Sequence, residues 1–362
     1  MPTTLTTLTA LDTTGTTGTT GTSDTADTAS TTTTAPADLV LPDQVRDALG
    51  RRLTLLPDPA LDMDLATTHY HQLFAALPTS LLQRALDFGR HNDTPGVLLV
   101  RNLPVDPVLP PTPTDGGPSR EKATFVAEGV LLGLSGLLGE PMGVLGEKDG
   151  RIVHDVLPVE GGATTQTNQG SAVFLNFHSD IVHDPIGRYD LANPDFLVLS
   201  CLRGDPDGSA ATFYADARDI AAVLPREATE ILASPLFRLN APGSHTRSVA
   251  GGNEVLSDPV AILSGGTDFP EIAVSANGVR PLTRSAERAL ARLQEASREV
   301  ARPVLLAPGQ ALLINNRKGV HARSVFRARY DGTDRWVQRT YVRRSLWNIR
   351  YRAVPQVRRV HY

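Results

Sequence analysis

Residues 176–185, NFHSDIVHDP, contain metal-binding side chains at a spacing suited to one face of a strand. His178 and Asp180 lie two residues apart, at the end of the apolar run SAVFLNF. Side chains two apart on a strand point to the same side, so this imidazole and this carboxylate can reach one divalent ion. Two histidines and one carboxylate on one face of a metal, with the other positions open, are typical of non-haem Fe(II) oxygenases. The pattern therefore requires one more histidine.

That histidine is expected at the end of another strand. In residues 309–324, GQALLINNRKGVHARS, His321 follows an apolar strand and a glycine turn. A barrel brings distant strands together, so the long separation in sequence is expected. His183 and Asp184 form a competing pair, which we rank lower because they follow the strand, where hydrogen bonds within a loop are their ordinary role.

Three arginines at four-residue spacing follow His321. Residues 326–347, FRARYDGTDRWVQRTYVRRSLW, hold Arg335, Arg339 and Arg343. The Asp-Gly dipeptide predicts a turn that returns their strand beside the strand near His321, and the spacing predicts one shared face. Guanidinium groups bind carboxylates bidentately, as a dicarboxylic cosubstrate of iron would require. The alternative is an exposed edge strand whose arginines serve solubility.

The elements that position these residues follow from the hydrophobic pattern. Helical spacing and β-rich runs occupy different parts of the chain. The expected helices are residues 41–56, 64–91 and 121–139, with a strand at 95–104. After Gly150, nine short β-rich runs are interrupted by helices only at 216–233 and 282–301. We therefore expect a mainly β fold with flanking helices, a barrel or jelly roll.

Composition sets the domain organisation and excludes several classes of protein. Residues 1–37 are rich in Thr, Gly, Ala and Ser, so we expect a disordered tail without catalytic function. Residues 38–362 are expected to form one domain, with a helical part at 41–140 and a β core at about 150–345. The 362 residues carry a net charge of -4, which disfavours nonspecific binding to nucleic acid or anionic membranes.

Cysteine content and hydropathy also point to a cytoplasmic protein. Cys201 is the only cysteine, which excludes an intramolecular disulfide framework and Cys-rich metal sites. We expect it to be a small buried apolar residue. No run approaches the roughly 20 apolar residues of a membrane span, and the N-terminus lacks the pattern of a secretory signal.

Together, NFHSD, GQALLINNRKGVHAR and RYDGTDRWVQRTYV resemble the clavaminate synthase-like Fe(II)/2-oxoglutarate-dependent oxygenases. This family includes amino-acid β-hydroxylases of antibiotic biosynthesis, and the resemblance covers about residues 90–345. It implies a double-stranded β-helix, that is, a cupin-like jelly roll. It also implies an enzyme that uses Fe(II), 2-oxoglutarate and dioxygen.

The resemblance assigns roles to individual residues. It implies that His178, Asp180 and His321 hold the iron. Arg335, together with Thr212 in SAATFYA, would bind the 5-carboxylate of 2-oxoglutarate, and Arg339 would face the carboxylate of the substrate.

The resemblance also bears on the substrate. Residues 147–171 resemble the family's stretch that contacts substrate amino and carboxylate groups, with Glu147 and Asn168 as candidates; the alternative for each is an ordinary loop residue. Relatives that hydroxylate arginine carry an acidic pair where this chain has PEIAVSANGV, so we expect a side chain without a strong positive charge. Most relatives use His-x-Glu, while halogenating relatives replace the carboxylate with a small residue, so Asp180 favours hydroxylation.

The expected function is hydroxylation, at the β-carbon, of a free or carrier-bound amino acid, with release of succinate and carbon dioxide. Desaturation or oxidative cyclisation by the same iron site is one alternative, and a noncatalytic barrel that binds an anion through its arginines is another. Outside this site, we expect His154 to be a core histidine, and His69 and His71 to be exposed on a helix. The sequence does not indicate an oligomeric state.

Overall fold

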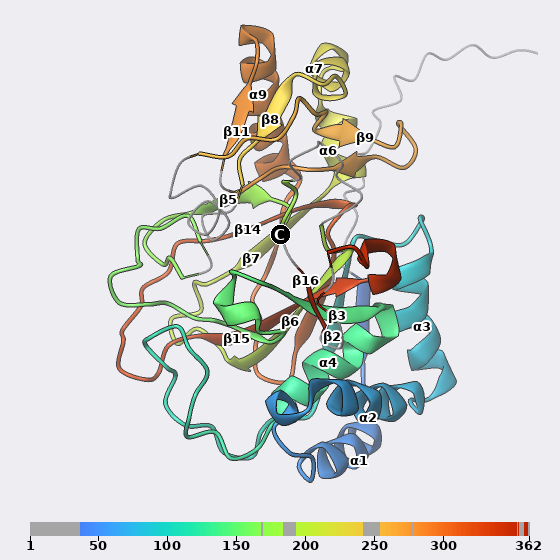
Figure 1. Cartoon of the computed structure of the whole chain (residues 1–362), viewed down its shortest axis with the longest axis vertical. Helices are drawn as coiled ribbons and strands as arrows, with labels where there is room; N and C mark the ends of the chain where they lie inside the picture. The colour runs from blue at the N-terminus through green and yellow to red at the C-terminus, as the bar shows by residue number, and fades with distance from the viewer. Residues whose placement is uncertain are drawn as a thin grey trace, which may run out of the picture. The chain divides into compact units, whose positions relative to one another are not determined.

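The computed structural model describes residues 37–167, 169–183, 193–241, 254–276, 278–352, 354 and 358–360 (Figure 1). All of them belong to one compact unit, Thr33–Tyr362. The predicted tail, residues 1–37, lies outside the described residues except for Ala37. Ala37 begins the first strand, so the predicted end of the tail is one residue too late. Asn168, Asp184 and Asn277 also lie outside the described residues.

The larger of two main sheets has eight strands. Its order is β1-β2-β13-β6-β15-β3-β16, and β4 also pairs with β15. The bounds are β1 Ala37–Val40, β2 Val97–Arg101, β13 Ala311–Asn315, β6 Phe196–Arg203, β15 Trp336–Arg343, β3 Glu140–Val144, β16 Arg359–Val360 and β4 His154–Val156. Its central strands β13, β6 and β15 are almost entirely buried. The apolar runs of β13 and β6 predict this burial, whereas β15, WVQRTYVR, also buries polar and charged side chains.

The second main sheet has four strands in the order β12-β7-β14-β5. Its bounds are β12 Arg302–Val304, β7 Thr212–Asp216, β14 Gly319–Arg323 and β5 Leu175–His178. Side chains from β5, β7 and β14 line one cavity together with side chains from β6 and β15, so the two sheets enclose it. Two short ribbons complete the strands, β9 Leu263–Ser264 with β10 Glu271–Ile272, and β8 Phe237–Leu239 with β11 Val279–Pro281.

Helices flank the sheets. Those of the N-terminal part are α1 Asp43–Leu53, α2 Met63–Ala75, α3 Thr79–Arg90 and α4 Val126–Leu138; those further on are α6 Ala217–Val223, α7 Arg226–Leu232 and α9 Arg284–Val300. α4 packs against α2, β6 and β15. α2 can approach α4 closely because Gly133 has no side chain, and a Cβ atom at this position would clash with the ring of Phe74. Among the residues described, no helix has the length and apolar character needed to cross a bilayer.

The predicted elements are present in the structure with different boundaries, but six of its strands lie outside every predicted strand: β1, β3, β8, β11, β14 and β16. Each of the nine predicted β-rich runs contains a strand. Two segments expected to be single helices are each divided, because proline cannot continue a helix: Pro78 separates α2 from α3, and Pro225 separates α6 from α7. His321, expected just after a strand, lies within β14.

The predicted pairing of the arginine strand is wrong. β15 lies in the larger sheet beside β6, β3 and β4, whereas β14 has β7 on one side and β5 on the other. Both edges of β14 are therefore occupied, and the turn at Asp331–Gly332 leads the chain to the opposite sheet. Arg335 and Arg339 line the cavity, but Arg343 does not. The guanidinium of Arg343 instead forms an ion pair of 3.6 Å with Asp195.

Candidate active site

The three predicted metal ligands meet at the edge of the four-stranded sheet. His178 on β5 and His321 on β14 are register partners, and their ring centroids lie 4.3 Å apart. Asp180 follows just past the end of β5. One ligand atom from each of the three residues lies within 4.8 Å of the others, the only such group of metal-binding side chains among the described residues. This set can hold one divalent ion.

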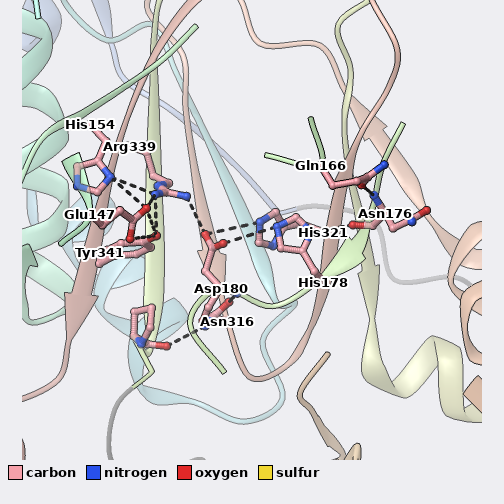
Figure 2. Close-up of polar contacts among 11 residues, drawn as sticks. Glu147, His154, Gln166, Asn176, His178, Asp180, Asn316, His321, Arg339 and Tyr341 are labelled. Carbon is pink, nitrogen blue, oxygen red and sulfur yellow. Dashed lines mark hydrogen bonds and ion pairs between the residues drawn. The ribbon is translucent and has the colours of Figure 1, made fainter. Parts of the chain in front are cut away.

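The hydrogen bonds leave the metal-binding atoms available (Figure 2). Nδ1 of His178 lies 2.7 Å from the carbonyl oxygen of Asn176, which favours the tautomer that keeps Nε2 free for a metal. That Nε2 is 3.6 Å from one Asp180 oxygen, and Nε2 of His321 is 3.8 Å from the other. Gln166 supports β5 by donating to the carbonyl of Phe174 at 2.9 Å.

Electrostatics keep Asp180 and His321 in the protonation states that bind a metal. Burial alone would raise the pKa of Asp180, but the charge of Arg339, with contributions from His178 and His321, outweighs it and holds this pKa well below its ordinary value. Burial, with a contribution from His178, lowers the pKa of His321 to about 3. A charged carboxylate and a neutral imidazole are the forms that coordinate divalent ions.

Asn316 fixes the loop that carries Asp180, a role that sequence reasoning missed. The backbone N–H of Asp180 donates to Oδ1 of Asn316 at 2.9 Å, and Nδ2 of Asn316 donates back to the carbonyl of Asp180 at 2.9 Å. Asn316 follows β13 directly and is fully buried. The shared direction of His178 and Asp180 therefore depends on this clamp, because Asp180 lies beyond the regular strand.

The ligands line a cavity of about 370 Å³, a volume suited to a small molecule. Leu197 and Leu199 on β6 supply part of its apolar wall, and Arg335, Arg339 and Tyr341 face it from the larger sheet. The three ligands therefore share this cavity with two guanidinium groups, those of Arg335 and Arg339.

Arg339 is enclosed by hydrogen-bond partners (Figure 2). Its guanidinium donates to Asp180 at 3.1 Å, to Glu147 at 2.9 Å and to the Tyr341 hydroxyl at 2.6 Å. Burial would lower the pKa of Arg339, but Tyr341, Asp180 and Glu147 raise it above its ordinary value. Arg339 thus connects the carboxylate of a predicted metal ligand with that of a predicted substrate residue.

His154 belongs to the same network. It is fully buried on β4, which confirms the expected core position, but its Nδ1 also lies 3.1 Å from Nη2 of Arg339. Burial and the charge of Arg339 lower the pKa of His154 to about 3. The neutral ring can accept a hydrogen bond from Arg339. Sequence reasoning missed this contact and that of Tyr341.

Glu147 is presented by a strained segment between β3 and β4. Lys148 and Asp149 have φ values of 48° and 59°, the left-handed region that non-glycine residues rarely adopt. Gly146 and Gly150 on either side also have positive φ. Backbone strain of this kind often accompanies a functional site.

A second group of polar side chains occupies another part of the cavity. Arg335 precedes β15, while Thr212 and Arg323 are register partners on β7 and β14. All three are buried and line the cavity. Within the described part of the chain, no carboxylate forms an ion pair with Arg335.

The remaining residues singled out from the sequence lie outside the metal-binding cluster or outside the described part of the chain. His183 lines the cavity but lies outside the metal-binding cluster, and its predicted partner Asp184 is not among the described residues. Asn168 is not described either. His69 and His71 are exposed on α2, and Cys201 is buried on β6, as expected.

Comparison with known proteins identifies the family. The family model described as taurine catabolism dioxygenase TauD, TfdA family, matches residues 77–341. The chain belongs to this family. L-asparagine oxygenase from Streptomyces coelicolor is 34% identical over 307 residues, which cover 84% of this chain and 87% of the relative.

Two solved structures extend the comparison to the cofactors. Asparagine oxygenase in complex with Fe(II), 2S,3S-3-hydroxyasparagine and succinate has a TM-score of 0.78 and 31% identity, covering 90% of this chain and 99% of that one. OrfP, a non-haem iron oxygenase solved with Fe and α-ketoglutaric acid, has a TM-score of 0.73 and 26% identity, covering 89% and 99%. OrfP is also solved with succinate and (3S)-hydroxy-L-Arg.

These findings confirm the predicted jelly-roll fold and the predicted class of enzyme. This member of the TauD/TfdA family is a dioxygenase that depends on Fe(II) and 2-oxoglutarate. The predicted function, amino-acid hydroxylation, is confirmed at the level of the family.

Proposed function

We propose that this dioxygenase hydroxylates the β-carbon of an amino acid and that His178, Asp180 and His321 hold its iron. One observation carries the proposal: the three ligand atoms lie within 4.8 Å of one another, on the wall of a cavity that Arg335 and Arg339 also line. When bound, iron with 2-oxoglutarate and dioxygen supplies the oxidising power that replaces a C–H hydrogen by hydroxyl, while 2-oxoglutarate becomes succinate and carbon dioxide.

The protein's own residues position the two organic reactants. Arg335 and Thr212 bind the distal carboxylate of 2-oxoglutarate, since a buried guanidinium without a carboxylate partner is a strong anion site. The apolar wall formed by Leu197 and Leu199 limits the access of water to the cavity.

Arg339, Glu147 and Asn168 orient the amino-acid substrate. Nε of Arg339 is buried without a hydrogen-bond partner, so one donor remains for the substrate carboxylate. The side chain of Glu147 is 24% exposed and carries the negative charge that an α-ammonium group needs. Asn168 is assigned to the substrate by the sequence resemblance alone, because it lies outside the described residues.

The side chain of the substrate carries no strong positive charge. Relatives differ in the charge of the amino-acid side chain: one is named as an asparagine oxygenase, and another was solved with a hydroxylated arginine. In this chain the cavity wall beside Asp180 holds Ser275, whose hydroxyl donates to the carbonyl of Asn240 at 2.9 Å. A hydroxyl cannot neutralise a buried guanidinium or ammonium group.

A succinate-release screen tests the proposal. The protein is reconstituted anaerobically with Fe(II), then given 2-oxoglutarate, dioxygen and a panel of free amino acids and carrier-bound aminoacyl thioesters. We expect succinate and a product one oxygen atom heavier than the substrate, and NMR should place the hydroxyl on the β-carbon. A product two hydrogen atoms lighter would indicate desaturation or ring closure. No substrate-dependent succinate across the panel, with retained anion binding, would favour a noncatalytic barrel.

A further inference from the structure

Arg323 is a buried cation whose position has no purely structural explanation. It lies two residues after His321 on β14, so both side chains point to the same side of the sheet and line the same cavity. It is only 5% exposed. Its register partner on the neighbouring strand β7 is Thr212, the residue proposed to bind the distal carboxylate of 2-oxoglutarate.

Most hydrogen-bond donors of Arg323 have no partner. Nη2 donates to the carbonyl of Val173 at 3.2 Å, and the guanidinium lies 5.1 Å from the ring centroid of Phe326. Nε and Nη1 are buried and have no hydrogen-bond partner. A native fold rarely leaves donors of a buried charge unsatisfied unless a ligand satisfies them.

Arg335 strengthens this argument because it is a second cation in the same part of the cavity. It is also 5% exposed, and no described carboxylate forms an ion pair with it. Arg323 and Arg335 line the same cavity and lie close enough for their charges to repel each other. Asp205 is the carboxylate whose charge acts on Arg335, but it forms no ion pair with Arg335, so an anion bound in the cavity would offset the repulsion between the two guanidinium groups.

We infer that Arg323 is a further binding residue for the cosubstrate. Together with Arg335 and Thr212, it donates hydrogen bonds to the distal carboxylate of 2-oxoglutarate. This inference rests on the proposed function, which places 2-oxoglutarate in this part of the cavity. A carboxylate has two oxygens and about four acceptor positions, enough for two guanidinium groups and a hydroxyl.

The inference is tested by comparing two cosubstrates in Arg323→Gln and Arg323→Lys. Kd is measured by anaerobic calorimetric titration of the Fe(II)-loaded protein, and KM by succinate release or oxygen uptake. The comparison compound is 2-oxopentanoate, which has the same chain length as 2-oxoglutarate but no distal carboxylate. We expect Arg323→Gln to raise Kd and KM for 2-oxoglutarate about 10- to 100-fold, with a smaller increase for Arg323→Lys. Kd for 2-oxopentanoate and KM for the amino acid should stay within about twofold.

Phe326→Leu is the matched control because it removes the aromatic neighbour of Arg323 without changing the charge of the cavity. It should leave Kd for 2-oxoglutarate unchanged. An equal loss for both cosubstrates in Arg323→Gln, or the same loss in Phe326→Leu, would assign Arg323 to packing and overturn the inference. If Arg323→Gln does not fold, an unchanged Kd in folded Arg323→Lys would also overturn it. Failure of the wild-type protein to bind 2-oxoglutarate would instead contradict the proposed function.

Discussion

Arg335 and Arg339 lie four residues apart and line one cavity, yet their surroundings are opposite. Arg339 contacts two carboxylates, a tyrosine hydroxyl and a histidine, whereas Arg335 has no described carboxylate partner and lies near a second unsatisfied guanidinium. A cation with internal partners is held in place before any ligand arrives. A cation without them is complete only when an anion binds. The Arg339 end is therefore organised by the fold, and we expect the Arg335 end to be completed by the cosubstrate.

The largest expected effect comes from removing any one of the three proposed metal ligands. His178→Ala, Asp180→Ala and His321→Ala should each abolish Fe(II)-dependent hydroxylation, because two remaining ligands hold a labile divalent ion poorly. Bound iron measured by metal analysis and succinate yield provide the readouts. Iron content should be normal in His183→Ala, which tests the competing pair. Normal iron content and turnover in His321→Ala would remove that residue from the site.

The next effect concerns the charge of the substrate. The wild-type enzyme should disfavour arginine against the best neutral amino acid by roughly 100-fold or more in kcat/KM, because an unpaired buried cation costs several kcal/mol. Ser275→Asp combined with Asn277→Asp should narrow this ratio, and the neutral control Ser275→Asn should not. Competitive turnover followed by mass spectrometry gives the ratios. Arginine as the best wild-type substrate would refute this argument without affecting the iron assignment.

The comparison between the arginines predicts that substitutions of Arg335 and Arg339 raise the Michaelis constants of different reactants. Arg335→Lys keeps the charge but loses the bidentate geometry, so it should raise KM for 2-oxoglutarate about 10- to 100-fold and leave KM for the amino acid almost unchanged. Arg339→Lys should act mainly on KM for the amino acid. If both variants changed only KM for 2-oxoglutarate, the proposed role of Arg339 would be wrong.

The smallest expected effect lies outside the cavity. Deletion of residues 1–36 should leave succinate turnover unchanged and alter Tm by less than about 1 °C, because the Thr- and Gly-rich composition offers little apolar surface for packing. Differential scanning calorimetry measures Tm. The deletion stops before Ala37, since that residue pairs with Leu98 in the larger sheet. A loss of many degrees would show that the segment packs against the domain.

Local spacing predicted much of the fold and the residues of the candidate metal site. His178, Asp180 and His321 lie together in the structure as predicted, although Asp180 lies past the end of β5 and is aligned by Asn316, not by the alternation of a strand. The sheet assignment of β15 was wrong because an Asp-Gly turn specifies the direction of the chain locally. Whether the next strand pairs with its predecessor depends on whether that predecessor still has a free edge, which is a property of the whole sheet.

The missed residues have different physical explanations. The clamp formed by Asn316 and the contact between His154 and Arg339 join segments far apart in sequence, so no local pattern reveals them. Arg323 is different, because it lies two residues after His321. The alternation that connected His178 with Asp180 would also have placed Arg323 on the side of the metal.

β5 is an edge strand of the four-stranded sheet, hydrogen-bonded in its ladder only to β14, and it leads directly into Asp180. Edge strands are among the parts of a fold that open locally without global unfolding. Detachment of β5 would displace His178, while His321 remained on β14 and Asp180 remained bonded to Asn316. We therefore expect the lifetime of a metal held by these ligands to depend on this local opening equilibrium, and ligand binding in the cavity, which favours the closed form, should prolong that lifetime.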